Sequence, residues 1–334
     1  MAQMTRMDRH KKEEQPVEHE LPQKEKKPKK VKRKKRRGFF FYLFLILIII
    51  LLGSGIGYAK GYFSAKADQK NAPKQEIEFN GQPASNGRTN VLILGSDSRG
   101  EDQGRADTIM VASYSTHDKT PKLMSIMRDT YVSIPMDNQE IQQNKINAAY
   151  AFGGAEKMRQ TITNNFGIPI QYYAVVNFKS FPIIIDTLVP SGLSIDAEKT
   201  LDVEGTTIQQ GPQKLNGNQA LAYARFRKDE EGDFGRVRRQ QQVMTTIMKD
   251  ALKPTNLWRV PEVTGTALGY TDTNIPFTNL SKISASYLFS KHQPMEILTV
   301  PVKDSYVDSY YDHAGSVLEI NVEQNKQAIQ NFLQ

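Results

Sequence analysis

The sequence of 334 residues contains no cysteine and only one tryptophan. Without cysteine, disulfide frameworks, thiolate zinc sites and cysteine nucleophiles are excluded. Histidine is also scarce, and no two histidines stand at the spacing of metal ligands. The five are His10, His19, His117, His292 and His313. The length allows one domain of roughly 200–250 residues, which is enough for a proper core, together with accessory segments.

The body of the chain lacks an excess of charge of either sign. The whole chain has 44 basic and 36 acidic residues, and its net charge of +8 would by itself suggest nucleic-acid binding. However, residues 1–37 hold 15 of the basic and 6 of the acidic groups, which leaves 29 and 30 for the remainder. The body is therefore nearly neutral, so any anion that it binds must be held by a local cluster of basic groups.

One long apolar run follows the basic tail. Residues 39–59 carry no charged side chain, and as a helix they would extend about 31 Å, the thickness of a bilayer hydrocarbon core. The block of lysine and arginine at 26–37 predicts a cytoplasmic tail, so the chain after the span is expected outside the cell. We therefore expect a disordered tail over 1–38, a retained transmembrane helix over 39–59, a polar extracellular linker over 60–87 and an extracellular domain over 88–334.

Two alternatives compete with parts of this interpretation. A cleaved signal peptide would use the triplet Ala65-Lys66-Ala67, but the basic region and the apolar run are both too long for one. The tail could also attract anionic lipid or nucleic acid, although a role in topology alone accounts for it. No nucleic-acid partner is expected.

The pattern after residue 88 predicts an α/β domain. Apolar runs predict strands over 90–96, 108–116, 121–127, 171–177, 191–196 and 295–301, and helical patterns cover 154–166, 178–189, 216–226, 233–252 and 321–334. Because strands and helices alternate, we expect a central, mainly mixed β-sheet covered by helices on both faces.

Carboxylates follow the first strand, in the segment LGSDSRGEDQGRADTIM. Gly95 and Gly100 have the spacing of a P-loop, but Glu101 stands where the lysine is required, so that motif is excluded. Asp97 and Asp107 could share a hard cation such as Mg²⁺, which prefers carboxylates and phosphate oxygens. The alternative is a solvated polar turn.

Arginines gather in a later segment, ALAYARFRKDEEGDFGRVRRQ. Helical spacing places Arg236, Arg239 and Gln240 on one face, whereas Arg238 points elsewhere. Guanidinium groups suit phosphate oxygens and keep their charge, and a helix N-terminus adds partial positive charge. The alternative is a surface helix with salt bridges to nearby acids. The pair Arg128-Asp129, directly after the strand 121–127, matters only if it joins such a site.

These segments together resemble the LytR-CpsA-Psr family, which attaches polymers to the cell wall of Gram-positive bacteria. The resemblance covers the tail, the span and the outer domain, and its motifs are GSDSRG…GRADTIM, SIMRDTYVSIP, KINAAYAFGG and QALAYARFR…GDFGRVRRQQ. Met127 departs from the family, which usually has proline before Arg-Asp-Thr.

The resemblance implies roles for individual residues. Asp97 and Asp107 would bind Mg²⁺. The catalytic residues would be Asp97, Arg105, Asp107, Arg128, Arg225 and Arg227. The pyrophosphate of a polyprenyl-linked substrate would be held by Arg105, Arg128, Arg225, Arg227, Arg236 and Gln240. A prenyl pocket is expected among the apolar residues of 150–189.

The resemblance also implies a reaction. A glycopolymer phosphate, such as wall teichoic acid, would move from undecaprenyl pyrophosphate to the C6 hydroxyl of N-acetylmuramic acid in peptidoglycan. Asp97 or Asp107 could act as the base, although a metal-bound carboxylate is a poor one. A polyprenyl-pyrophosphate phosphatase and a non-enzymatic, membrane-anchored envelope regulator stay open as alternatives.

Overall fold

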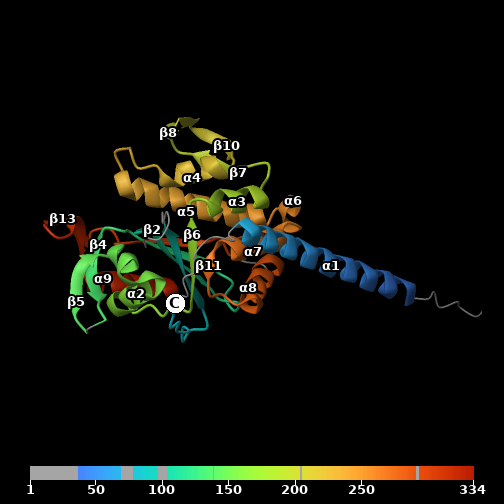
Figure 1. Ribbon diagram of the computed structural model, residues 1–334, viewed down its shortest axis with the longest axis horizontal. Helices are drawn as coiled ribbons and strands as arrows, with labels where there is room; N and C mark the ends of the chain where they lie inside the picture. Colours follow the sequence, from blue (N-terminus) through green and yellow to red (C-terminus); the bar gives the residue numbers. More distant parts are fainter. Residues whose placement is uncertain (1–36, 69–77, 97–103, 138, 204, 291–292) are drawn as a thin grey trace, which may run out of the picture. The chain divides into compact units, whose positions relative to one another are not determined.

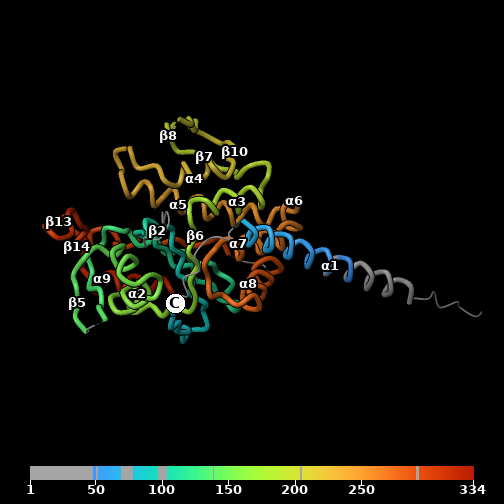
Figure 2. The backbone as a smooth tube through the Cα atoms, viewed as in Figure 1, coloured from blue at the N-terminus to red at the C-terminus, as the bar shows by residue number. Residues whose placement is uncertain are grey.

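The computed structural model describes residues 37–68, 78–96, 104–137, 139–203, 205–290 and 293–334, without the side chains of 37–47, 50 and 51 (Figure 1, Figure 2). The predicted tail and the candidate ligand Asp97 lie outside these residues, apart from the last two positions of the tail. The chain divides into two compact units, Met1–Leu47 and Ile48–Gln334, and every contact given below belongs to the second unit.

Helix α1 (Arg37–Asp68) continues beyond the end of the predicted span. Within the described part of the chain, no helix is both long and apolar enough to cross a membrane, and the predicted span of 39–59 lies partly outside the described side chains. Residues 57–65 of α1 pack closely on α7 (Val260–Tyr270). The approach is so close that a Cβ added at Gly265 would lie 2.1 Å from the carbonyl oxygen of Tyr58. Residues 60–68, which we expected in the linker, are helical because they pack in this way.

A six-stranded sheet forms the centre of the domain. Its order is β11 (Asp272–Thr273), β6 (Tyr172–Asn177), β1 (Thr89–Ser96), β2 (Ala106–Tyr114), β3 (Lys122–Ile126) and β12 (Glu296–Val300). Strand β1 is parallel to β6 and antiparallel to β2, and β3 is antiparallel to β2 and parallel to β12. The prediction of a mixed central sheet is confirmed.

Helices pack on both faces of this sheet. Because successive side chains of a strand alternate between its faces, every second residue of β1, β2 and β3 joins one core. Helices α2 (Ala148–Phe166) and α9 (Val322–Leu333) complete that core, whose buried members include Leu92, Leu94, Ile109, Val111, Met124, Met158, Phe166 and Ile329. On the opposite face, Gln241 of α5 (Gly232–Ala251) donates to Ser125 Oγ of β3 at 3.0 Å and to Thr299 Oγ1 of β12 at 2.9 Å.

A second core holds α5 together with the segment that precedes it. Its elements are α3 (Ser180–Leu188), α4 (Gly217–Arg225), the antiparallel pair β7 (Leu193–Ala197) and β10 (Gly211–Leu215), and the pair β8 (Leu201–Val203) and β9 (Thr206–Ile208). Tyr223 of α4 is fully buried in this core. The same core therefore packs the end of α4 against the second half of α5, and both helices carry predicted site residues.

Several elements were not predicted. A four-stranded sheet has the order β13 (Tyr306–Tyr311), β14 (Gly315–Ile320), β4 (Thr130–Pro135) and β5 (Ile141–Lys145), and α6 (Pro254–Leu257), α7 and α8 (Phe277–Phe289) follow α5. Strand β5 has the sequence IQQNK, which lacks apolar alternation, and α8 has no buried residue. Such segments take their structure from their neighbours, which pattern analysis of one segment does not detect.

The predicted helix boundaries were mostly accurate. Helix α4 begins with a capping box between Asn216 and Gln219, and Pro182 lies in the first turn of α3 as expected. Helix α2 ends at Gly167, whose φ is 71°, but it begins six residues before the predicted start. Gly153 and Gly154 kink it between its two parts, which is why the pattern predicted only the second part.

The buried amide of Gln241 should stabilise the packing of α5 on the sheet. Replacing Gln241 with alanine leaves the buried hydroxyl of Ser125 and the half-buried hydroxyl of Thr299 without their partner, so we expect a loss of about 2 kcal/mol in the free energy of unfolding. Thermal unfolding of the full chain in detergent would measure it. Lys249→Ala, at an exposed position of the same helix, is the control and should change stability by less than about 0.5 kcal/mol. Equal effects of both changes would contradict this role of Gln241.

Candidate functional site

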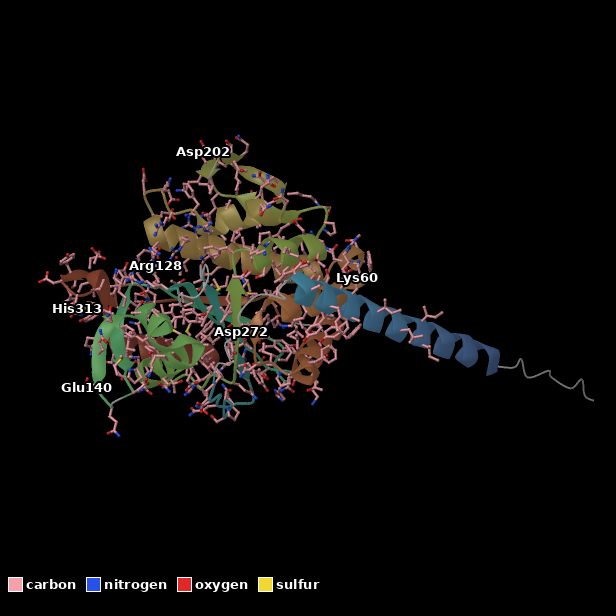
Figure 3. The ribbon with its side chains drawn as sticks, in the orientation of Figure 1. Lys60, Arg128, Glu140, Asp202, Asp272 and His313 are labelled. Atoms are coloured by element: carbon pink, nitrogen blue, oxygen red, sulfur yellow. The ribbon has the colours of Figure 1, made fainter. Side chains whose placement is uncertain are left out.

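The ends of β2 and β3 bring two predicted site residues together. Asp107 lies at the start of β2, and Arg128 follows the end of β3. Because β2 and β3 are antiparallel neighbours, these two ends meet at one edge of the sheet, where Arg128 Nη1 donates to Asp107 Oδ1 at 2.8 Å. Figure 3 labels Arg128 in this region.

Arg128 contacts two further carboxylates. Its Nε donates to Asp129 Oδ2 at 3.4 Å, and its Nη2 lies 3.6 Å from Asp233 Oδ1. Asp129 also pairs with Lys145 at 3.0 Å, at the end of β5. The Arg128 guanidinium thus links the start of β2 and the end of β3 to the first turn of α5.

The first turns of α5 close the site from the other side. Arg236 Nη2 lies 2.8 Å from Asp233 Oδ1 and donates to the carbonyl oxygen of Asp107 at 3.2 Å. One turn later, Gln240 donates to Thr108 Oγ1 at 2.9 Å. The predicted i, i+4 pair Arg236 and Gln240 therefore faces the start of β2.

Gly95 allows Thr108 its place in this arrangement. A Cβ at Gly95 would lie 2.8 Å from the Cβ of Thr108, so a larger residue on β1 would displace the partner of Gln240. The first glycine of the segment that resembles a P-loop thus has a packing role in the sheet.

The other two arginines of α5 do not join the site. Arg239 was predicted on the same face as Arg236, but its side chain is buried, pairs with Asp229 at 2.8 Å and donates to the carbonyl oxygen of Phe226 at 2.7 Å. Through these two contacts Arg239 holds the segment between α4 and α5 against the helix. Arg238 points elsewhere, as predicted, and pairs on the surface with Glu198 and Glu231.

Three predicted arginines lie around the cluster. Arg225 ends α4, and its guanidinium carbon lies 4.2 Å from the centre of the Phe178 ring. Arg227 is exposed but close enough for its charge to lower the pKa of Arg236. Arg105 is exposed just before β2. The structure therefore brings together Asp107, Arg128, Arg236 and Gln240, whereas Arg105 and Arg227 make no hydrogen bond to them among the described residues.

Burial and charge shift the pKa values at the site. Burial raises the pKa of Asp233, although the charges of Arg236 and Arg128 oppose the shift. Burial lowers the pKa of Arg236, and the pKa of Arg128 is raised because its hydrogen bond to Asp107 and the nearby carboxylates outweigh burial. The two guanidiniums therefore stay charged beside an acid that holds its proton more tightly than usual.

Two buried polar atoms of the cluster have no hydrogen-bond partner in the described part of the chain. They are Arg236 Nε and Asp233 Oδ1. The latter lies near two guanidiniums but without hydrogen-bond geometry, so these contacts are ionic. A buried N–H donor without a partner is costly, and an anion bound here would satisfy it.

The donor chemistry at Asp107 fits a hard cation. Its side chain is partly exposed, and only Oδ1 contacts a described residue. Oδ2 is therefore available as a ligand, as Mg²⁺ sites that combine one or two carboxylates with phosphate oxygens require. Among the described residues there is no group of three or more acidic or histidine side chains suited to a metal, and the second predicted ligand, Asp97, lies outside them.

Sequence reasoning missed Asp233 and Lys145 as members of the site, and it considered Asp129 only as the neighbour of Arg128. Asp233 is one of the nearby acids that the alternative of a salt-bridged surface helix uses. Its position three residues before Arg236 was an available signal, because side chains at i and i+3 of a helix are neighbours. Lys145 gave no local signal, since its place depends on the pairing of β5 with β4.

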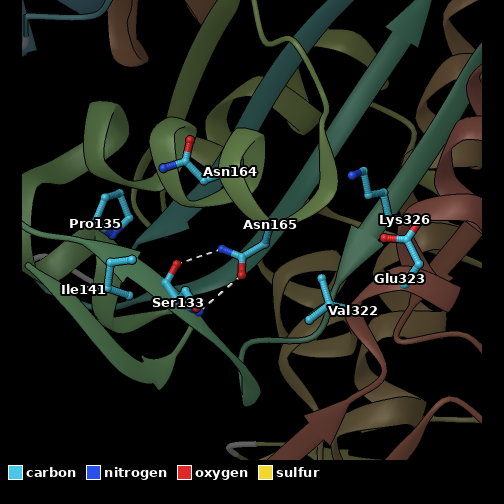
Figure 4. A pocket seen from close by; sticks show the side chains of 8 residues that line it. All are labelled: Ser133, Pro135, Ile141, Asn164, Asn165, Val322, Glu323 and Lys326. Carbon is cyan, nitrogen blue, oxygen red and sulfur yellow. Dashed lines mark hydrogen bonds between the residues drawn. The ribbon is translucent and has the colours of Figure 1, made fainter.

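Two hollows on the described surface lie apart from this cluster. One of about 400 Å³ lies where β4 and β5 meet α2 and α9 and is lined by Ser133, Pro135, Ile141, Asn164, Asn165, Val322, Glu323 and Lys326 (Figure 4). The apolar residues of 150–189, where a prenyl pocket is expected, include Met158, Phe166, Ile185 and Leu188 of the two cores. The prenyl pocket stays a prediction.

Taken together, the site is a cluster of arginines and carboxylates at the edge of a mixed sheet, suited to holding an anion with a hard cation. A profile of the LytR_cpsA_psr family matches residues 56–329, and the chain belongs to this family.

Named relatives agree with this assignment. The chain is 42% identical over 282 residues to the regulatory protein MsrR of Staphylococcus aureus, covering 84% of this chain and 82% of that one. It is 40% identical over 185 residues to the polyisoprenyl-teichoic acid–peptidoglycan teichoic acid transferase TagU of Bacillus anthracis, covering 55% and 58%. The crystal structure of TagV from B. subtilis matches with a TM-score of 0.64 and 28% identity, over 75% of this chain and 98% of that one.

The charge of Arg128 should affect stability more strongly at neutral than at acidic pH. Because the pKa of Asp233 is raised above its ordinary value of 3.8 by burial, the folded state binds that proton more tightly than the unfolded state. Its ionisation therefore lowers stability as pH rises through the folded pKa. Arg128 opposes this loss, so Arg128→Ala should destabilise most at neutral pH and progressively less as pH falls toward 3.8.

Thermal unfolding across this pH range would measure the effect. Arg238→Ala is the matched control, because its partners are at the surface, and it should change stability little at any pH. A loss for Arg128→Ala that does not vary with pH would contradict the interpretation.

Proposed function

We propose that this protein is a phosphotransferase that moves a glycopolymer phosphate from an undecaprenyl-pyrophosphate carrier to peptidoglycan. The observation that carries this proposal is the convergence of Arg128 and Arg236 on Asp107, with a buried guanidinium N–H that has no described partner. The family and the similarity to TagU support a transferase, and TagU is named for teichoic acid as the group it transfers.

The proposed reaction needs positioning and charge neutralisation rather than covalent help from the protein. The C6 hydroxyl of N-acetylmuramic acid attacks the phosphorus on the sugar side of the pyrophosphate, and a new P–O bond forms. The bond from that phosphorus to the bridging oxygen breaks, and undecaprenyl phosphate leaves with the electron pair. Arg128 and Arg236 hold the phosphate oxygens, with Arg105, Arg225, Arg227 and Gln240 placed around them.

Asp97 and Asp107 would hold Mg²⁺, which would supply further positive charge to the pyrophosphate. A carboxylate committed to a metal is a weak proton acceptor. We therefore assign the proton of the attacking hydroxyl to Asp233, whose pKa is raised by burial and whose Oδ1 has no hydrogen-bond partner.

We also propose a single-pass type II topology, with 39–59 as the membrane span and the domain outside the cell. The apolar run and the basic block before it support this arrangement. The span would keep the site where a lipid-borne donor and the wall meet, which raises their effective concentration.

Assay of the purified full chain in detergent tests the reaction. It would be incubated with labelled lipid-linked polymer and peptidoglycan, with and without Mg²⁺. The transferase predicts label bound to peptidoglycan, and removal of Mg²⁺ should abolish it. Soluble phosphorylated polymer without wall-bound label would instead identify a phosphatase.

Arg236 and Arg238 form a matched pair for testing the site. Arg236→Lys keeps the charge that Asp233 requires but removes the planar fork of donors, so we expect transfer to fall about 100-fold. Arg238→Lys, two residues away on the surface, should leave the rate within about two-fold. Initial rates of label transfer would measure both, and equal losses would mean that neither guanidinium has a special position.

A non-enzymatic regulator would depend on different parts of the chain, and this alternative has a basis because the relative MsrR is named a regulatory protein. If the tail carried the function, deleting residues 1–30 would abolish it while Arg128→Ala would be harmless. We expect the reverse, provided that the shortened chain inserts normally. Wall polymer in cells that carry each variant would be quantified.

A further inference from the structure

Residues 57–65 of α1 run parallel to α7, and the close approaches at the glycines of both helices fix their register. A Cβ at Gly57 would lie 3.9 Å from Pro261, one at Gly61 would lie 2.2 Å from the carbonyl oxygen of Glu262, and one at Gly269 would lie 2.3 Å from Ala65. Close approach through small residues allows little sliding between the helices. An ion pair of 2.8 Å between Lys60 and Glu262 agrees with this register. Figure 3 labels Lys60 on α1.

This register places the turn Leu257–Arg259, which precedes α7 and is called the corner below, beside the C-terminal end of the apolar run 39–59. Pro261 lies opposite Gly57, and at 1.5 Å per residue the corner Leu257–Arg259 is level with roughly Ser54. Residues 48–59 of the apolar run belong to the same compact unit as this corner. If that run enters a bilayer, the corner therefore reaches the boundary between hydrocarbon and headgroups.

The corner has the composition that such a boundary favours. Trp258 is the only tryptophan of the chain, and 66% of its surface is exposed, as is 39% of Leu257. The guanidinium of Arg259 lies 4.2 Å from the centre of the Trp258 ring. Phe277, half exposed at the start of α8, packs on Tyr58 with ring centres 4.8 Å apart, so further aromatic rings lie at this level.

We propose that the corner Leu257–Arg259 docks on the bilayer surface, with the Trp258 ring among the headgroups and the Arg259 guanidinium on lipid phosphate. Tryptophan is enriched at both membrane interfaces, and arginine places its charge in the polar layer while its stem stays in apolar surroundings. This inference rests on the membrane span proposed above. With α1, the corner gives the domain two attachments and so fixes its tilt and the height of the arginine site above the membrane.

The single tryptophan allows a direct test with the full chain. The protein would be reconstituted into phosphatidylcholine–phosphatidylglycerol vesicles with brominated or ordinary acyl chains. We expect the emission of Trp258 to be at least halved by the brominated lipid. In the control, Trp258→Phe with Tyr310→Trp, the reporter moves to an exposed position of β13, far from α7 in Figure 1, and its emission should be equal in both vesicles.

Flotation of the same vesicles separates the two proposals. Protein that floats but whose Trp258 emission is equal in both lipids would overturn the docking and leave the span intact. Protein that does not float would overturn the span and the docking together. Neither result depends on transfer activity, so failure of the transferase proposal would be recognised independently.

A functional consequence gives a second measurement. Trp258→Ser should raise the KM for a membrane-borne donor several-fold, with little change for a short-chain donor in solution, because the site itself is untouched. Tyr310→Ser is the control for an exposed aromatic residue. An unchanged KM for the membrane-borne donor would show that the corner does not position the domain and would overturn that part of the inference.

Discussion

The ion cluster around Arg128 is the constraint on which the rest of the site depends. It joins β2 and β3 to the first turn of α5, which lies more than a hundred residues later in the sequence. A buried charge is stable only when it is paired, so Asp233 requires Arg236 and Arg128 as much as they require it. Gln240 and Gln241, one turn further along α5, then hold the helix against β2, β3 and β12. The position of the Arg236 guanidinium is thus set by the packing of a whole helix.

The charge balance of the cluster explains why a cation would be useful in it. Arg128, Arg236 and Lys145 face the carboxylates of Asp107, Asp129 and Asp233, so the described cluster is neutral before any ligand arrives. A pyrophosphate brings further negative charge, which needs new positive charge beside it. The exposed Arg105 and Arg227 offer some, and a divalent ion on Asp107 would supply the rest. Local neutrality also agrees with the near-zero charge of the chain outside its basic tail.

Much of this arrangement could be predicted from sequence, and the errors have physical reasons. The strands of the central sheet and helices α4, α5 and α9 were predicted because each carries its own apolar periodicity or caps. Spacing on α5 correctly paired Arg236 with Gln240 and excluded Arg238, but it misplaced Arg239. The cause is Asp229 in the connection before the helix, which draws the Arg239 guanidinium away from the sheet. Asp129 and Lys145 meet only through the pairing of β4 with β5, a contact that no pattern within a single segment encodes.

The helical packing of residues 60–68 changes how an anchor could act on the site. A polar linker would leave the domain free to tumble above a membrane, whereas α1 packs on α7, α7 on α3, α3 on α4, and α4 on α5. Each contact is between rigid helices, and α5 carries Arg236. The close approach at Gly61 and Gly265 therefore begins a continuous packed path that ends at the helix carrying Arg236. The glycine contacts thus help to place that helix even though they take no part in the chemistry of the site.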